Sequence, residues 1–262
     1  MSTPKSAPTI WSAGRYDAVG ERIAPIAAEV VAAARRRGPF HEVADLACGT
    51  GNAALAAAAV GAHVTAVDVT PELIAIGRQK AQRIGRAVAW VTADAADTGL
   101  PGGSFDTVVS NMGIVFVEPT TQVAEVARLL KPGGALAFSS WVRDANNPFF
   151  GPIVEVVGPP PTSGFAPDQW GEPETVRDRL AADFVDVEIA RGSHPWRLGT
   201  LDEAVRFVTQ ESPMHVSVFS SVDGSRRDRL IAAFTETFDA HVGRDGIVAY
   251  DAPYAVVTAL RR

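Results

Sequence analysis

Short apolar segments alternate with amphipathic segments along residues 41–142 of the chain. The apolar segments are residues 42–47, 63–69, 87–92, 105–110 and 135–141. Residues 120–130 have helical spacing and end at Lys131-Pro132-Gly133-Gly134, a sequence that stops a helix. Strands that alternate with helices in this way form a parallel sheet with helices on both faces. Continuous apolar runs such as Thr107–Val109 are typical of strands that are buried on both faces.

The two flanking regions have different patterns. Residues 11–37 place Ile23, Ile26, Val30 and Ala34 three or four positions apart, which predicts one amphipathic helix. Beyond residue 142 we expect a loop at 157–167, strands at 184–190 and 256–260, and helices at 172–182, 201–209 and 226–241. The strand at 256–260 is expected at the edge of the sheet or beside 184–190. No linker separates two cores, so we predict a single domain.

Composition excludes several classes of protein. The chain has 262 residues, a formal net charge of -6 and 47% hydrophobic residues, as ordinary globular proteins do. Its one cysteine, Cys48, cannot form an internal disulfide, and there is no apolar run of about 18 residues to span a membrane. Residues 1–8 are polar and show no signal peptide. The acidic balance disfavours nucleic acid as a partner, because its phosphates need a positive surface. Without a signal peptide or a membrane span, we expect a cytoplasmic protein without membrane insertion.

A glycine-rich turn follows the first apolar run. Asp45-Leu46-Ala47-Cys48-Gly49-Thr50-Gly51 lies where a strand is expected to pass into a helix, and the glycines let a ligand approach the backbone. The helix that follows offers free N–H groups to an electronegative ligand. Asp68 ends the next apolar run, where an acid can accept hydrogen bonds from both hydroxyls of a ribose. The combination predicts a site for an adenosine-type cofactor.

Two classes of cofactor fit these residues. Gly49-x-Gly51-x-x-Ala54 followed by Asp68 matches the dinucleotide fingerprint of an NAD(P)-dependent or flavin-dependent oxidoreductase. Against that class, Asp45 places a carboxylate where it would repel a pyrophosphate. Asp94, at the end of the third apolar run, can accept a hydrogen bond from an adenine amine. Three acids at one edge of the sheet favour a ligand with an ammonium, a sulfonium, a ribose and an adenine.

Five motifs in this order resemble those of class I S-adenosylmethionine-dependent methyltransferases, in particular the small-molecule group that includes quinone-biosynthesis enzymes (methyltransferase type 11). The motifs are Asp45-x-Ala47-x-Gly49-x-Gly51, with Ala47 in place of a more usual Gly, then Asp68, Ala93-Asp94-Ala95, Leu100-Pro101-x-x-Ser104-Phe105-Asp106 with Ser110-Asn111-Met112, and Leu129-Leu130-Lys131-Pro132-Gly133-Gly134. The resemblance implies an α/β fold with a Rossmann-like seven-stranded, mostly parallel sheet, an N-terminal helical cap and C-terminal lid insertions.

The same resemblance implies S-adenosyl-L-methionine as the cofactor and a small molecule as the methyl acceptor. Gly49, Gly51 and Asp45 would hold the methionine end, with Asp45 either in direct contact or bracing the loop. Asp68 would bind the ribose, and Asp94 with Ala95 the adenine. Further cofactor contacts are expected from Tyr16, Ala47, Val69, Asn111 and Met112. The domain would consist of a cap at 8–40, a cofactor-binding core at 41–142, an acceptor or lid region with the sixth strand at 143–245, and a last strand at 246–262.

The sequence does not fix a catalytic residue. Methyl transfer from a sulfonium mainly needs alignment and exclusion of water, so a general base is optional. His194 and His215 are the candidates for such a base, because His41 and His63 border strands and His241 ends a helix. We expect no metal, because no His, Cys, Asp and Glu cluster has the spacing of metal ligands.

Aromatic residues beyond the carboxyl edge of the sheet indicate the kind of acceptor. Phe116, Trp141, Phe149 and Trp196 are expected to form either a pocket for a flat, hydrophobic acceptor or the core of a lid. The same apolar additions would also serve a homodimer interface. Three other functions stay open: an oxidoreductase, a nucleic-acid or protein methyltransferase, and a protein that binds the cofactor without methyl transfer. Ser110-Asn111-Met112-Gly113 stands where an Asn-Pro-Pro-aromatic motif would indicate amide or base nitrogens as acceptors.

Overall fold

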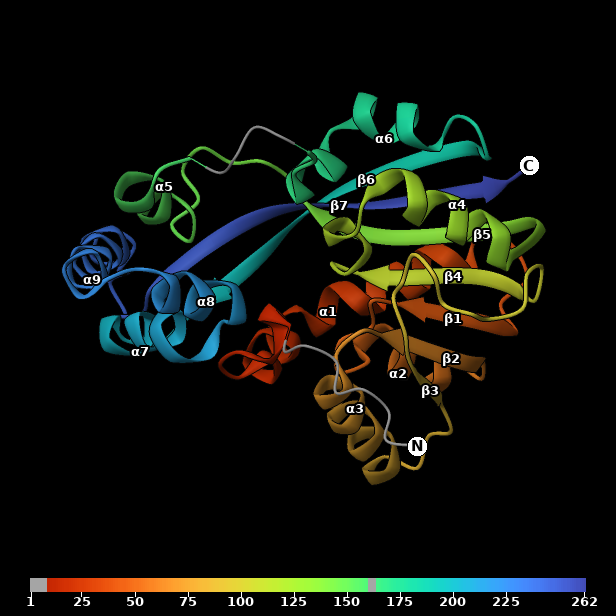
Figure 1. The fold of residues 1–262 in the computed structure, drawn as a ribbon, viewed down its shortest axis with the longest axis horizontal. Helices are drawn as coiled ribbons and strands as arrows, with labels where there is room; N and C mark the ends of the chain where they lie inside the picture. Colours follow the sequence, from red (N-terminus) through yellow and green to blue (C-terminus); the bar gives the residue numbers. More distant parts are fainter. Residues whose placement is uncertain (1–8, 160–163) are drawn as a thin grey trace.

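The computed structural model describes residues 9–159 and 164–262 of the chain. Within these residues seven strands form one sheet in the order β3-β2-β1-β4-β5-β7-β6 (Figure 1). The strands are β1 (Glu42–Leu46), β2 (His63–Asp68), β3 (Ala89–Thr92), β4 (Phe105–Asn111), β5 (Leu130–Trp141), β6 (Phe184–Arg197) and β7 (Ala249–Arg261). Strands β1 to β5 are parallel, and β7 runs antiparallel to both β5 and β6. The predicted Rossmann-like, mostly parallel sheet is confirmed.

Helices cover both faces of this sheet. The α-helices of the described residues are α1 (Tyr16–Arg35), α2 (Asn52–Ala59), α3 (Pro71–Arg83), α4 (Pro119–Leu129), α5 (Gly151–Val157), α6 (Pro173–Leu180), α7 (Leu201–Arg206), α8 (Pro213–Ser221) and α9 (Gly224–Asp239). Three short 3-10 helices, η1 (Ile10–Ser12), η2 (Ile114–Phe116) and η3 (Pro167–Gly171), and one π-helix, η4 (Phe207–Glu211), complete them. None of these helices is long and apolar enough to cross a membrane.

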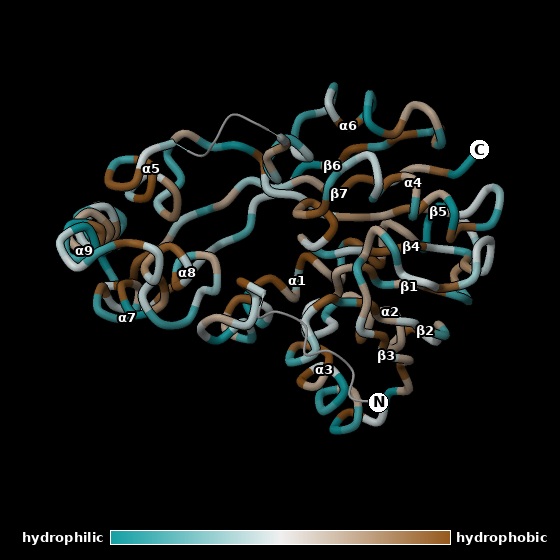
Figure 2. Tube along the Cα trace, viewed as in Figure 1, coloured by the Kyte–Doolittle hydropathy of each residue, from teal (hydrophilic) through white to brown (hydrophobic). Residues whose placement is uncertain are grey.

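Neighbouring residues of the inner strands point to opposite faces, and each face has its own hydrophobic core. Val43 and Val109 belong to the core beneath α1 and α2, whereas Ala44 and Val108 belong to the core beneath α4 and α6. All four are fully buried. Burial on both sides explains why these strands are continuous apolar runs in the sequence. In Figure 2 α3 alternates between hydrophobic and hydrophilic residues along its length.

Strands β6 and β7 extend past the end of β5 as a two-stranded ribbon. β5 pairs with β7 only from Tyr254 onward, but β6 continues to pair with β7 as far as Ala249. The ribbon reaches the helices α5, α7, α8 and α9, which form a lid beside the sheet (Figure 1). The predicted strands at 184–190 and 256–260 are therefore too short. β7 lies beside β6 and inside the sheet, whose edges are β3 and β6.

The N-terminal helix is shorter than predicted from residues 11–37. It begins at Tyr16, because Gly14 has a left-handed φ of 63° and a Cβ on it would lie 2.6 Å from the carbonyl oxygen of Glu211. The backbone N–H of Arg15 donates to the same carbonyl at 2.8 Å. The segment before α1 is thus attached to the lid instead of extending the helix. Residue 8 of the predicted cap and residues 160–163 of the predicted loop 157–167 lie outside the described residues.

Candidate active site at the carboxyl edge of the sheet

The carboxyl ends of β1 and β4 lie side by side at the centre of the sheet. Ala47 follows β1 with a φ of 50°, and Met112 follows β4 with a φ of 57°, so both have left-handed backbones. A Cβ on the next residue, Gly113, would lie 2.2 Å from the carbonyl oxygen of Ala47, so the two chain ends approach closely. Ligands of open α/β sheets bind at this point, where the connections of neighbouring strands diverge.

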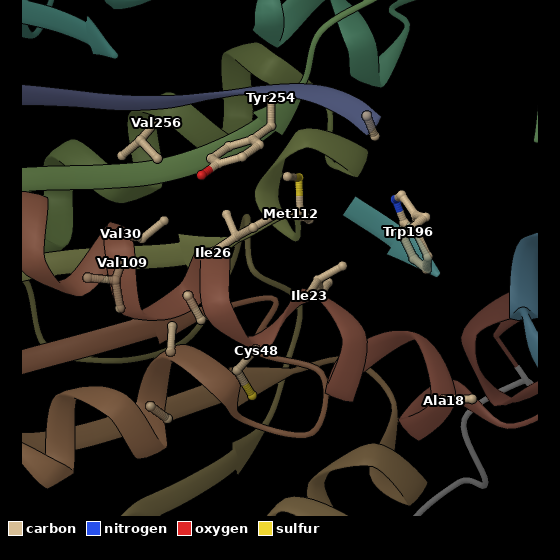
Figure 3. Packing of buried hydrophobic residues seen from close by; sticks show 14 of the residues in the cluster. Ala18, Ile23, Ile26, Val30, Cys48, Val109, Met112, Trp196, Tyr254 and Val256 are labelled. Carbon is tan, nitrogen blue, oxygen red and sulfur yellow. The ribbon is translucent and has the colours of Figure 1, made fainter. Parts of the chain in front are cut away.

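A cavity of about 450 Å³ opens at this edge. Seven of the predicted cofactor residues line it: Tyr16, Ala47, Asp68, Val69, Asp94, Ala95 and Met112. Three of the predicted acceptor residues line it as well: Phe116, Trp141 and Trp196. Figure 3 shows that Ile23 of α1, Met112 and Trp196, which all line the cavity, lie around one space between α1 and the strand ends. The structure therefore brings most of the predicted residues of both groups to one place.

Asp68, at the end of β2, is held by the backbone on both carboxylate oxygens. Its Oδ2 accepts the N–H of Gly49 at 2.8 Å, and its Oδ1 accepts the N–H of Thr70 at 2.9 Å. Burial raises the pKa of Asp68, and these two N–H groups partly oppose the shift. Each carboxylate oxygen can accept more than one hydrogen bond. Asp68 thus keeps acceptor capacity toward the cavity that it lines.

Asp45 lies behind the glycine turn and does not line the cavity. Its Oδ2 accepts the N–H of Ala54 in α2 at 2.7 Å, and its Oδ1 is buried without a partner in the described residues. Burial, with a smaller contribution from the charge of Asp68, raises the pKa of Asp45 to about 8. Of the two roles expected for Asp45, the geometry fits that of a brace between β1 and α2.

The two glycines of the turn are packed against side chains of the protein itself. A Cβ on Gly49, whose φ is 56°, would lie 2.5 Å from the Tyr16 hydroxyl oxygen. A Cβ on Gly51, whose φ is 85°, would lie 2.4 Å from the Trp90 ring. Neither glycine lines the cavity, so their contact with the cofactor stays a prediction. Tyr16 covers the turn instead, and burial raises the pKa of its hydroxyl.

Asn111, the last residue of β4, is also outside the lining of the cavity. Its Nδ2 donates to the carbonyl of Ile23 at 3.3 Å, and its Oδ1 accepts the hydroxyl of Ser139 at 2.8 Å. Asn111 therefore connects β4 to α1 and β5, and its predicted contact with the cofactor is likewise untested.

The charged residues of the cavity are acidic. Asp68, Asp94 and Glu118 line it, and no Lys or Arg is among the described residues that do so. Asp94 is exposed and its Oδ1 accepts the N–H of Ala96 at 2.8 Å, while two backbone N–H groups of α4 lower the pKa of Glu118 to about 2. Such a lining favours a cationic ligand and disfavours a pyrophosphate. Across residues 9–159 and 164–262, no group of three or more His, Cys, Asp or Glu side chains could hold a metal ion.

The two candidate histidines do not reach the cavity. The predicted strand at 184–190 would leave His194 in a loop, but His194 lies within β6. It packs edge-on against Trp196 with ring centroids 5.6 Å apart. Burial lowers its pKa. His215 is buried in α8, between the hydroxyl of Ser212 at 2.7 Å and the carbonyl of Phe149 at 3.0 Å. Ser212 does line the cavity, although its sequence context, a serine before Pro213, indicates only a helix start.

Aromatic rings form one wall of the cavity. Trp11 packs on Phe116 with centroids 4.7 Å apart, and Trp141 lies 6.0 Å from Trp196. Phe149 does not line the cavity; it lies behind Trp196, at 5.1 Å, in the aromatic core of the lid. The remaining lining residues are Trp11, Val19, Ile23, Leu73, Ala96, Gly113, Val117, Glu118, Thr121, Ser212, Pro213 and Met214.

The fold and the site define an α/β protein with a cavity at the carboxyl edge of its sheet, acidic on one side and aromatic on the other. Residues 44–138 match the family model described as a methyltransferase domain. An uncharacterized protein of Mycobacterium tuberculosis is 32% identical over 191 residues, which cover 70% of this chain and 68% of that protein. Demethylmenaquinone methyltransferase of Clavibacter sepedonicus is 40% identical over 97 residues, which cover 37% of this chain and 39% of that enzyme. The chain belongs to the class I S-adenosylmethionine-dependent methyltransferases, and its cofactor is S-adenosyl-L-methionine.

Solved structures with this fold agree with that assignment. The YcgJ protein of Bacillus subtilis superimposes with a TM-score of 0.59 at 17% identity, covering 93% of this chain and 99% of that one. Phosphoethanolamine N-methyltransferase 2 of Haemonchus contortus, in complex with S-adenosyl-L-methionine, gives 0.53 at 18% identity, covering 88% and 52%. At these identities the likeness concerns the fold. The family decides against the alternative of a nicotinamide-dependent oxidoreductase.

Proposed function

We propose that the protein transfers the methyl group of S-adenosyl-L-methionine to a small, flat, hydrophobic or aromatic acceptor. The observation that carries this proposal is that one cavity is lined by acidic residues of the cofactor edge and by an aromatic wall. A ligand with a sulfonium and an ammonium matches the acidic side. The wall of Trp11, Phe116, Trp141 and Trp196 matches an apolar ring system.

The residues of the cofactor edge fit S-adenosyl-L-methionine. Asp68 would accept the ribose hydroxyls, Asp94 with Ala95 would hold the adenine, and the turn at 45–51 would hold the methionine end. When bound, the cofactor supplies an electrophilic methyl group on its sulfur. We infer the division that the sequence predicts: a cap at 8–40, a cofactor-binding core at 41–142, an acceptor or lid region with the sixth strand at 143–245, and a last strand at 246–262.

The aromatic wall would exclude water and align the acceptor, which are the main requirements of a displacement at a methyl group. The name of one relative, demethylmenaquinone methyltransferase, indicates a quinone-type acceptor for that enzyme. A quinone-type ring is flat and apolar, and the aromatic wall of this cavity would suit such a ring. The proposal covers small molecules of this shape and leaves nucleic acid and protein outside it.

Two measurements test the proposed function. Calorimetric titration should give tighter binding of S-adenosylhomocysteine than of NAD, and a preference for NAD would contradict the proposal. A labelled-methyl assay over phenols, quinones, heterocycles and carboxylic acids should then detect transfer to flat apolar members of the panel. Cofactor binding without transfer to any acceptor would identify a protein that only binds the cofactor.

A matched pair of variants tests the role of the wall. Trp196→Leu should raise the KM for the acceptor and leave the affinity for S-adenosylhomocysteine unchanged. Trp170→Leu removes another buried tryptophan, which packs on Phe138 and does not line the cavity. It should leave the KM unchanged. Equal effects of the two variants would mean that Trp196 acts only through folding.

A further inference from the structure

Ser212 and His215 form a hydrogen-bonded chain at the border of the cavity. Ser212 joins η4 to α8 and lines the cavity, and His215 lies one turn further along α8. The Oγ of Ser212 is 2.7 Å from Nδ1 of His215, and Nε2 of His215 is 3.0 Å from the carbonyl oxygen of Phe149. Both side chains are buried, at 6% and 9% exposure. The function proposed above uses neither of them.

The carbonyl of Phe149 fixes the direction of the protons along this chain. A carbonyl oxygen only accepts hydrogen bonds, so Nε2 of His215 must donate. Burial lowers the pKa of His215 to about 4, so its ring is neutral near pH 7 and has one N–H. Nδ1 therefore carries a lone pair and accepts the hydroxyl proton of Ser212. The Ser212 oxygen has no proton left to donate and can act toward the cavity only as an acceptor.

We propose that Ser212 determines specificity by accepting a hydrogen bond from a hydroxyl group of the methyl acceptor, so that the substrate is a flat hydroxyarene and the reaction an O-methylation. This inference rests on the proposed function and specifies its substrate class. The Ser212 oxygen accepts a hydrogen bond and lines the same cavity as the aromatic wall. Together they suit an aromatic ring that carries an O–H group. The methyl ether that the reaction forms has no proton to donate. Once His215 has released the transferred proton and is neutral again, Ser212 can only accept, and the product has no hydrogen bond to it.

The chain also provides a path for the proton of the acceptor. As the oxygen–carbon bond forms and the carbon–sulfur bond breaks, the electron pair of the broken bond stays on sulfur. The hydroxyl proton then becomes strongly acidic and passes to Ser212, whose own proton passes to Nδ1 of His215. A weak base is sufficient for an oxonium, whereas an arylammonium holds its proton much more firmly. This difference favours O–H over N–H acceptors.

The experiment uses matched probes that differ in one group. Hydroxyarenes of one to three rings, their methyl ethers and the corresponding arylamines are titrated into the intact protein saturated with S-adenosylhomocysteine. At least one hydroxyarene should bind roughly 10-fold more tightly than its ether, as expected for one buried hydrogen bond. Ser212→Ala should abolish this preference without changing the affinity for the ether. Ser212→Thr keeps the hydroxyl and should retain the preference.

A second variant tests the orientation of the serine. His215→Leu removes the acceptor of the Ser212 proton, so the freed hydroxyl can donate to an ether oxygen, and the affinity for ethers should rise. Equal binding of hydroxyarenes and ethers by the wild type, no binding of either, the same preference in Ser212→Ala, or tighter binding of arylamines would each overturn the inference. Labelled-methyl transfer is measured on the same samples. Transfer that Ser212→Ala leaves intact refutes only this inference, whereas a lack of cofactor binding refutes the proposed function as well.

Discussion

Replacing Asp68 by asparagine tests whether this carboxylate binds the cofactor, and a control variant separates that effect from a loss of stability. Asn has the same shape, but one of its terminal groups is a donor, which would face the N–H of Gly49 or Thr70. Leaving one buried backbone N–H without its acceptor should lower the free energy of unfolding by about 1–3 kcal/mol. Loss of a charge-assisted bond to a ribose hydroxyl removes about 1.5–3 kcal/mol from binding, or roughly 10- to 150-fold in Kd.

Asp106→Asn is the matched control for this substitution. Asp106 lies near the start of β4, at the end of the strand opposite to the cavity. Its Oδ2 accepts the N–H groups of His41 and Glu42 at 3.2 and 2.9 Å. Its Oδ1 accepts from Lys131 at 2.7 Å. This variant should also lose stability, but its affinity for S-adenosylhomocysteine should equal that of the wild type. Calorimetry gives the affinity, and urea denaturation gives the free energy of unfolding.

Two results would refute the reasoning on Asp68. Wild-type affinity for S-adenosylhomocysteine in Asp68→Asn would mean that this carboxylate does not bind the ribose. Equal weakening in Asp68→Asn and Asp106→Asn would mean that the loss of affinity follows from general destabilisation of the sheet. Only a loss confined to Asp68→Asn supports direct contact.

Three further predictions concern the packing around the turn. Ala47→Gly should raise the free energy of unfolding by up to about 1.6 kcal/mol in urea denaturation. A left-handed alanine costs about 1–2 kcal/mol, and the larger freedom of glycine in the unfolded chain offsets about 0.4–1 kcal/mol of this gain. A destabilised variant would contradict this prediction. The stability of the wild type should fall as the pH rises from about 4 to about 8. The folded state keeps the proton of Asp45 up to its raised pKa of about 8, whereas the unfolded state releases this proton near the ordinary pKa of an aspartic acid. Asp45→Asn should flatten this fall in urea titrations over the same range, and an unchanged slope would assign it to other groups. Gly77→Ala would place a Cβ 2.5 Å from the Trp90 ring and should destabilise the folded protein by about 1–3 kcal/mol in thermal unfolding. The control Gly224→Ala has open space around the new Cβ and should not destabilise it. Equal melting temperatures of the two variants would contradict the packing at Trp90.

The parallel half of the fold could be predicted from the sequence because its strands are buried on both faces. The expected boundaries of β1, β2 and β4 lie within one residue of the observed ones. The ribbon of β6 and β7 could not be predicted in full, because Gly192-Ser193-His194-Pro195 lies within β6 and has the composition of a turn. The short helices α5 and α8 could not be predicted for a similar reason. α5 begins with Gly151-Pro152 and α8 begins with Pro213 after Ser212, and both sequences have the composition of a turn.

The candidate site was predictable where it depends on the ends of strands. Asp68 ends β2, Asp94 follows β3 by two residues, and both line the cavity. The role of Gly51 depends on Trp90, which lies far from it in the sequence, so the spacing of residues could not indicate their contact. The orientation of Ser212 likewise depends on the carbonyl of Phe149, which only the folded lid brings to His215.

The ribbon of β6 and β7 has a consequence for how this protein can evolve. It carries Trp196 and leads to the lid, whereas the turn at 45–51 and Asp68 belong to the parallel half on the other side of β4. Substitutions in the ribbon and the lid can therefore remodel one compartment while the hydrogen bonds of the other stay as they are. Under the proposed function, the ribbon contributes Trp196 to the wall that faces the methyl acceptor. Selection for a new acceptor can then act on the ribbon and the lid without loss of the cofactor.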